Sequence, residues 1–183
     1  MARLPYLDKS DLAPEYQDLL NRPINIHRGL VNSPNARRAL SHAGHYIRYG
    51  SKLDPRLREL AILQVGYVER AAYEWSHHVK IGHEFGVTDD DIKALIDSTE
   101  GRPTKLDALT EAALQAAREL TTNADLSDAT FAVLHEHLDN ERLVDLLVAI
   151  SYYNYIVRIA AALRIDVEDE YLCYLEKFPL PPR

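Results

Sequence analysis

The chain has few cysteines, few glycines and no long apolar run, and each of these shortages excludes a class of protein. Its 183 residues include one cysteine, Cys173, and seven glycines. A single thiol excludes an intrachain disulfide framework and a cysteine-rich zinc site. No stretch approaches the roughly 18 uninterrupted apolar residues typical of a membrane-spanning helix, and the first residues lack the apolar segment of a signal peptide. We therefore expect a cytoplasmic protein with no membrane partner.

Positive charge is also scarce relative to negative charge. The formal net charge is −7, with 46% hydrophobic and 27% charged residues, which are ordinary proportions for one soluble globular domain. Binding to nucleic acid or to an anionic membrane requires clustered lysines and arginines, and the pair Arg37-Arg38 is too small a cluster for either. We expect no nucleic-acid partner.

The periodic segments predict an all-α fold. Alanine, leucine, arginine and glutamate dominate these segments, and β-branched runs are short. Residues 141–165 are apolar on almost every side, so this helix must be central in the fold or covered by a partner chain. The expected ends of helices come from local signals: Ser33-Pro34, Asp54-Pro55 and the Thr88/Asp91 pair as starts, and Gly86 as an end.

Composition divides the chain into three parts. Residues 1–23 contain three prolines and predict an N-terminal arm with one short helix at 14–21. Residues 24–170 form one helical domain, because the only candidate hinge, at 99–106, is short. Residues 171–183 form a C-terminal tail whose end, FPLPPR, is expected to be extended.

The segment YEWSHHVKIGHEFG, residues 73–86, carries the densest chemistry. Glu74 and His78 are four residues apart, so both side chains lie on one face of a helix, and Ile81 and Phe85 continue that face. Burial along such an apolar stripe would shift both pKa values and make a proton-transfer pair. The alternative is a solvated surface pair of little energetic consequence.

A metal site is a third interpretation of the same segment. Glu74 and His78 could each supply one ligand to a metal ion, and Glu59 could supply a third. The chain has no HExxH motif, however, and His77 and His83 point away from His78 on this helix. We expect no metal.

Glu59 lies among leucines in RLRELAILQV, one helix earlier. Its carboxylate either pairs at the surface with Arg56 or Arg58, or is buried and needs a partner such as His78 across a helix hairpin. Four polar residues interrupt the apolar helix at 141–165, where they either line a pocket or pack and hydrogen-bond across a subunit interface: Tyr152, Tyr153, Asn154 and Arg158.

Three stretches together resemble a known family. They are Arg58-Glu59-Leu60 at the start of one helix, Tyr73 to His78 in the next, and Gly86-Val87-Thr88 before the third. These stretches are similar to the core of the carboxymuconolactone decarboxylase family, which has the alkylhydroperoxidase AhpD-like fold. The resemblance implies an all-α, AhpD-like multi-helix bundle that assembles into a homo-oligomer, a trimer or a hexamer. It also implies that Glu59, Glu74 and His78 share a pocket.

The resemblance includes one departure that decides the expected chemistry. The hydroperoxidase branch has a Cys-x-x-Cys pair where this chain has Ala71 and Glu74, while Glu59 and His78 match that branch's glutamate and histidine. The pattern is closer to the decarboxylase branch, whose members act on a carboxylated lactone in aromatic-compound degradation and need no metal or organic cofactor. The resemblance thus implies a cofactor-independent lyase acting on a small molecule.

In that lyase, His78 is the expected general acid/base, Glu74 tunes it or itself exchanges the proton, and Glu59 holds the second imidazole nitrogen. Tyr73 and Tyr153 are the expected substrate-binding hydrogen-bond donors. Two alternatives stay open. One is the peroxidase or peroxiredoxin-type antioxidant enzyme of the family label, whose turnover would depend on Cys173. The other is a non-catalytic oligomeric binding protein.

Overall fold

The computed structural model describes residues 1–182, and within that range every regular element is a helix. The all-α expectation is confirmed. In chain order the elements are η1 (Lys9–Asp11), η2 (Pro14–Leu20), α1 (Asn25–Leu30), α2 (Pro34–His45), η3 (Tyr46–Gly50, a π-helical turn), α3 (Pro55–Val68), α4 (Ala72–Glu84), α5 (Asp89–Thr99), α6 (Ala108–Asn123), α7 (Asp128–His137), α8 (Asn140–Leu163), η4 (Asp169–Tyr171) and α9 (Leu172–Lys177).

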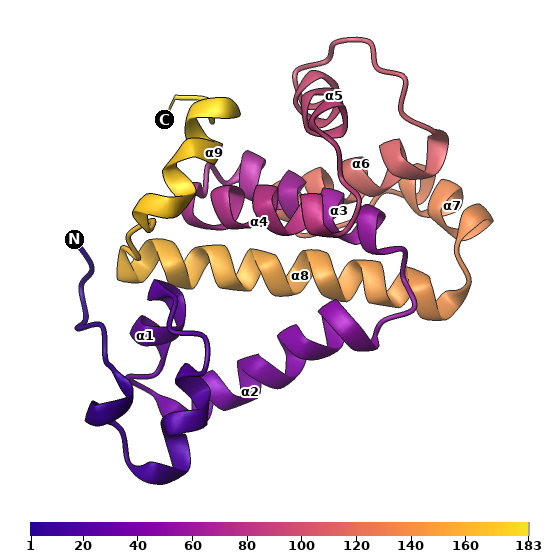
Figure 1. The fold of residues 1–183 in the computed structure, drawn as a ribbon. Helices are drawn as coiled ribbons and strands as arrows, with labels where there is room; N and C mark the ends of the chain where they lie inside the picture. The colour runs from indigo at the N-terminus through magenta and orange to yellow at the C-terminus, as the bar shows by residue number, and fades with distance from the viewer. Residues whose placement is uncertain (183) are drawn as a thin grey trace.

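Helix α8 is the central element of the bundle. It crosses the molecule with α3, α4 and α6 on one side and α1 and α2 on the other (Figure 1). Leu146, Ile150 and Val157 pack from α8 into one core cluster together with Ile62 of α3. On another face of α8, Ile156 and Ala160 belong to a separate cluster with Ile26 of α1. Because α8 packs against different partners on different faces, its buried residues are not confined to one stripe.

Helix α3 is buried on several sides, as its sequence predicts. Ile62 and Val65 face the cluster shared with α6 and α8, whereas Leu60 and Leu63 face a second cluster around Trp75 of α4. The charged residues of α3 that lie between these faces are therefore buried as well, and they need partners within the fold.

The local helix signals are mostly realised. Asp54 accepts a hydrogen bond from the Leu57 backbone N–H at 2.8 Å, and Thr88 and Asp91 form a capping box. Gly86 has a φ of +92°, the left-handed conformation in which glycine is favoured. Ser33 is different, because its side chain makes no capping hydrogen bond and Pro34 alone marks the start of α2.

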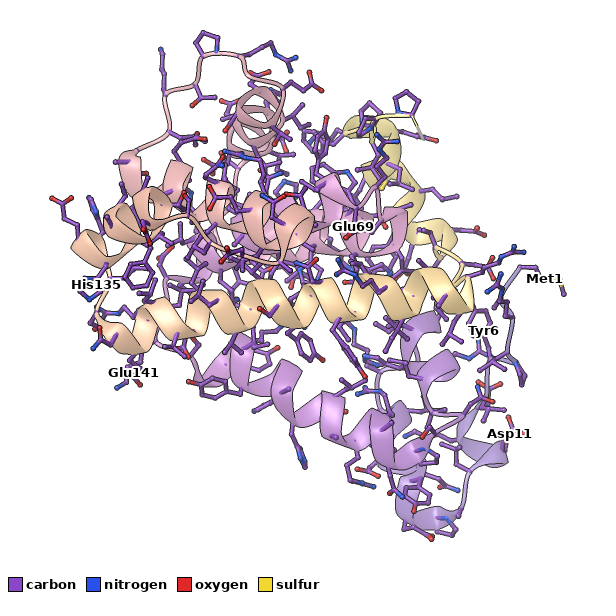
Figure 2. All side chains as sticks on the ribbon, turned by 180° about the vertical axis from the view of Figure 1, so that it is seen from behind. Met1, Tyr6, Asp11, Glu69, His135 and Glu141 are labelled. Carbon is purple, nitrogen blue, oxygen red and sulfur yellow. The ribbon has the colours of Figure 1, made fainter. Side chains whose placement is uncertain are left out.

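The two ends of the chain pack on the bundle. The Met1 amino group pairs with Asp166 at 2.9 Å, and the Tyr6 hydroxyl donates to the same carboxylate at 3.1 Å. Figure 2 shows Met1 and Tyr6 beside the end of α8. In the segment expected to be a tail, residues 172–177 form α9, which packs against α4, and the Trp75 indole N–H donates to the Phe178 carbonyl at 2.8 Å. Residue 183 lies outside the described residues.

By length and composition alone, α8 could also cross a membrane. In this chain it has the position of a core helix, and 44% of its most apolar window is buried. Val144, Val148 and Tyr155 remain exposed on its outer face. The expected cover for that face, a second copy of the chain, stays a prediction.

Candidate active site

The α3–α4 hairpin brings Glu59 and His78 into contact. Glu59 Oε2 lies 2.7 Å from His78 Nδ1, and the two residues are only 1% and 3% exposed. Glu59 therefore accepts a hydrogen bond from Nδ1–H, which leaves the lone pair of the neutral imidazole on Nε2. The hairpin fixes both the ring orientation and the tautomer of His78.

Arg58 binds the other oxygen of the same carboxylate. Its Nε and Nη2 atoms donate to Glu59 Oε1 at 3.1 and 3.0 Å, and Arg58 is itself 1% exposed. Burial alone would raise the pKa of Glu59, but the neighbouring His78 and Arg58 hold that pKa below its usual value. The sequence left open whether Glu59 pairs with an arginine or with His78, and in the structure it contacts both.

Glu74 lies on the other side of the His78 ring. Its Oε2 atom is 3.5 Å from His78 Nε2, a separation longer than a good hydrogen bond, and the side chain is buried. Burial raises the pKa of Glu74 to about 7, although the charge of Arg48 opposes the shift. Burial also lowers the pKa of His78, against the attraction of Glu59. An exchangeable proton is therefore available beside a neutral imidazole near neutral pH, and a solvated surface pair is excluded.

Glu74 and His78 open into a cavity of about 300 Å³. Its walls come from α1, α2, η3, α4 and α8, and they include the apolar side chains of Ile26, Ile81 and Ile156. This volume suits a small organic molecule. Glu59 does not line the cavity, so it acts on a bound molecule only through His78.

The two predicted substrate donors differ in their freedom. The Tyr73 hydroxyl donates to Glu168 Oε1 at 3.1 Å and accepts from the Ile26 backbone N–H at 3.2 Å, so it is already engaged. The Tyr153 ring packs edge-on against His78 at 4.6 Å between ring centroids, and Tyr153 lines the cavity. Of the two tyrosines, Tyr153 is the better placed to reach a ligand.

A second histidine cluster adjoins the first. His77 is stacked between the rings of Tyr73 and Tyr171, at centroid distances of 4.3 and 3.6 Å, and its Nε2 atom lies 2.8 Å from Glu168 Oε2. Glu168 also accepts from the Asn25 backbone N–H at 2.7 Å. This carboxylate ties α1, α4 and the segment after α8 together, and helical spacing from α4 alone gave no sign of it.

Sequence reasoning also missed two arginines. Arg37 of α2 and Arg48 of η3 line the cavity, although clustering of charge along the sequence gave no weight to either. Arg38, adjacent to Arg37, points elsewhere and pairs with Asp18 at the surface. Arg37 could have been identified from its position on the inward face of α2. That face cannot be assigned without knowing which element α2 packs against.

Cys173 lies apart from this site. It is exposed on α9 and is not among the residues that line the cavity. Within residues 1–182, no group of three metal-binding side chains is close enough together to hold an ion.

Comparison with protein families gives one match. The sequence model of the carboxymuconolactone decarboxylase family matches residues 34–119, which include α2, α3, α4 and α5. The resemblance inferred from the sequence is confirmed. No curated protein matches the chain.

Comparison with solved structures gives the fold. The AhpD-core, peroxidase-related protein of Ralstonia eutropha JMP134 has a TM-score of 0.76 at 17% identity, with 98% of each chain covered. The debrominase Bmp8 in complex with 2,3,4-tribromopyrrole has a TM-score of 0.81 at 17% identity, covering 97% of this chain and 100% of the other. A putative antioxidant defence protein AhpD from Agrobacterium tumefaciens has a TM-score of 0.68 at 24% identity, covering 75% and 93%. At these identities the likeness establishes the AhpD-like fold and leaves the reaction open.

Proposed function

Because the chain belongs to the carboxymuconolactone decarboxylase family through its residues 34–119, we propose that it is a cofactor-independent lyase of the decarboxylase type. Its substrate is a small carboxylated lactone or a similar enolisable compound. The observation that carries the proposal is the buried Glu74–His78 pair at the wall of a cavity of about 300 Å³.

The reaction follows from that pair. The bond between the substrate carbon and its carboxylate breaks, CO₂ leaves, and the electron pair moves into the conjugated carbonyl as an enolate. The carbon then takes a proton, and Glu74, with its pKa raised to about 7 by burial, is the donor, either directly or through His78 Nε2. Glu59 and Arg58 keep the imidazole in the tautomer that presents Nε2 to the cavity.

The peroxidase alternative requires a reactive thiol in the cavity, and the chain's one cysteine lies outside it. The debrominase of the same fold binds a small ring compound, tribromopyrrole, and this supports a small cyclic ligand here. An isomerase or a dehydratase could use the same proton-transfer pair, so the direct test is CO₂ release.

The test measures CO₂ release from γ-carboxymuconolactone and related carboxylated lactones. We expect Glu74→Gln and His78→Ala to reduce turnover by about 10²-fold or more, because each removes one member of the proton-transfer pair. Cys173→Ala and His83→Ala serve as controls, because both residues lie outside the cavity, and they should retain wild-type rates.

Absence of CO₂ release by the wild-type protein from every carboxylated lactone would reject the decarboxylase. Loss of turnover in Cys173→Ala would support the thiol enzyme instead.

A further inference from the structure

Three arginines line the cavity, and of these Arg22 is exposed, whereas Arg37 is buried and Arg48 is partly buried. Within residues 1–182, no aspartate or glutamate forms an ion pair with Arg37 or Arg48, although the terminal amino group and eleven other lysines and arginines in that range do pair. Arg37 is 8% exposed, and its Nε atom has no hydrogen-bond partner among residues 1–182. Within the same residues, the only hydrogen bond of its side chain goes from Nη1 to the Ser41 hydroxyl. A buried guanidinium left this way is costly unless something else binds it.

The other polar groups of the cavity do not neutralise this charge. Glu74 is largely protonated below neutral pH, because burial raises its pKa to about 7. His27 is neutral, since burial and the nearby Arg37 lower its pKa to about 3, and its Nδ1 atom lies 2.7 Å from the Arg22 carbonyl oxygen. Glu59 is already bound by Arg58 behind His78. The residues that line the cavity therefore carry an excess of positive charge, in a chain whose formal net charge is −7.

We propose that Arg37 and Arg48 bind a carboxylate of the substrate, and that this carboxylate remains on the product. The proposal rests on the lyase function above and names the residues that hold the second acidic group of such a substrate. Guanidinium groups are suited to the task because their planar N–H donors match the two oxygens of a carboxylate.

The energetics of decarboxylation explain why the arginines should bind the carboxylate that stays on the product and not the one that leaves. The charge of the leaving carboxylate moves onto the enolate as the bond to CO₂ breaks. An arginine ion pair with the leaving group would stabilise the substrate more than the transition state, and would slow the reaction. An ion pair with a second carboxylate is equal in both states, so it anchors the molecule without this penalty.

Binding of inert probes tests the anion site apart from the chemistry. Calorimetric titrations would compare benzoate, phenylphosphonate and the neutral benzamide on the wild-type protein, Arg37→Gln, Arg37→Lys and Arg48→Gln. We expect benzoate to bind the wild type more tightly than benzamide, and Arg37→Gln to weaken benzoate alone by about ten- to hundredfold. Arg37→Lys should lose less, since it keeps the charge. Arg38→Gln, one residue away and outside the cavity, is the matched control and should bind like the wild type.

Equal binding of benzoate and benzamide, or unchanged binding of benzoate by Arg37→Gln, would overturn the anion site. Tighter binding of phenylphosphonate than of benzoate would overturn the assignment to a carboxylate and indicate a phosphate group instead. These titrations need no turnover, so arginine-dependent binding by a protein without decarboxylase activity would reject the proposed function and leave the anion site standing.

Steady-state kinetics test which carboxylate is bound. If the arginines anchor the retained group, Arg37→Gln should raise KM for the carboxylated lactone by about tenfold or more while kcat changes little. If they instead bind the leaving group, kcat should rise in the variant, and that result would overturn the retained position. Arg37 is the better residue for this test, because Arg48 also acts on the pKa of Glu74.

Discussion

Glu74→Gln should stabilise the protein at alkaline pH even though it removes a proposed catalytic group. Glu74 is 5% exposed, and no arginine or lysine forms an ion pair with it within the described residues 1–182. Its Oε2 atom lies 3.5 Å from His78 Nε2, and burial lowers the pKa of that histidine. Ionised Glu74 is therefore poorly compensated in the fold. Glutamine has the same shape and carries no charge, so it avoids this penalty.

The magnitude and the sign follow from the two pKa values. The pKa of Glu74 is about 7 in the fold against an ordinary value of 4.5, so the folded state holds the proton more tightly than the unfolded state. Stability consequently falls as pH rises from 4.5 to about 7, and the full penalty is present above that range. A shift of this size corresponds to about 3 kcal/mol at pH 8 and about 1 kcal/mol at pH 5.

Urea denaturation of the wild type and Glu74→Gln between pH 5 and pH 8.5 measures this difference. The variant should gain on the wild type by roughly 2 kcal/mol between pH 5 and pH 8. Glu84→Gln, an exposed glutamate on the same helix, controls for the substitution itself and should stay within about 0.5 kcal/mol at every pH. A difference between Glu74→Gln and the wild type that does not change with pH would refute the argument that burial of an uncompensated carboxylate sets the proton affinity of this site.

Two further predictions concern the carboxylates that position the histidines. Glu59→Gln should lower the free energy of unfolding by about 3–5 kcal/mol, because it leaves Arg58 buried without its counter-ion. It should also reduce kcat, because His78 is no longer held in one tautomer. Urea denaturation and CO₂ release measure the two effects, and an unchanged free energy of unfolding would contradict the buried ion pair. Glu168→Gln should cost about 1–3 kcal/mol at neutral pH and speed hydrogen exchange at the Asn25 amide. Burial would raise the pKa of Glu168, but its interactions with His77 and the Asn25 N–H hold that pKa at about 2, below the ordinary 4.5. The stability that Glu168 contributes should therefore be lost as pH falls from 4.5 to about 2. An equal cost of Glu168→Gln at pH 2 and pH 7 would argue against this account.

Local sequence signals predicted the helices and, within the site, the pair of Glu74 and His78. The Thr88/Asp91 capping box and the start at Asp54-Pro55 depend only on neighbouring residues, so they could be identified without the fold. The same holds for Glu74 and His78, since a spacing of four residues places two side chains on one helix face wherever that helix lies. Glu59 required one additional step, that α3 and α4 form a hairpin.

The rest of the site depends on contacts that no local pattern encodes. Glu168 is 91 residues from His77 along the chain, and it reaches the ring only because the segment after α8 returns over α4. Arg37 enters the cavity because α2 lies across α8, whereas Arg38 on the same helix faces Asp18. Adjacent arginines thus have different environments, and charge counted along the sequence cannot distinguish them.

The charges of the cavity give a consistent account of the proposed cycle. With the substrate bound, the two positive charges of Arg37 and Arg48 equal the two negative charges of the substrate, Glu74 is protonated, and the sum over these groups is zero. After CO₂ leaves and the carbon takes the proton, the product keeps one negative charge and Glu74 acquires the other, so the sum is still zero. The net charge of these groups is therefore the same before and after the proton transfer, and no step changes the total charge of the buried space. The cost falls on product release, because the anion then leaves two guanidinium groups facing one carboxylate, and proton uptake by Glu74 restores the state that binds the next dianion.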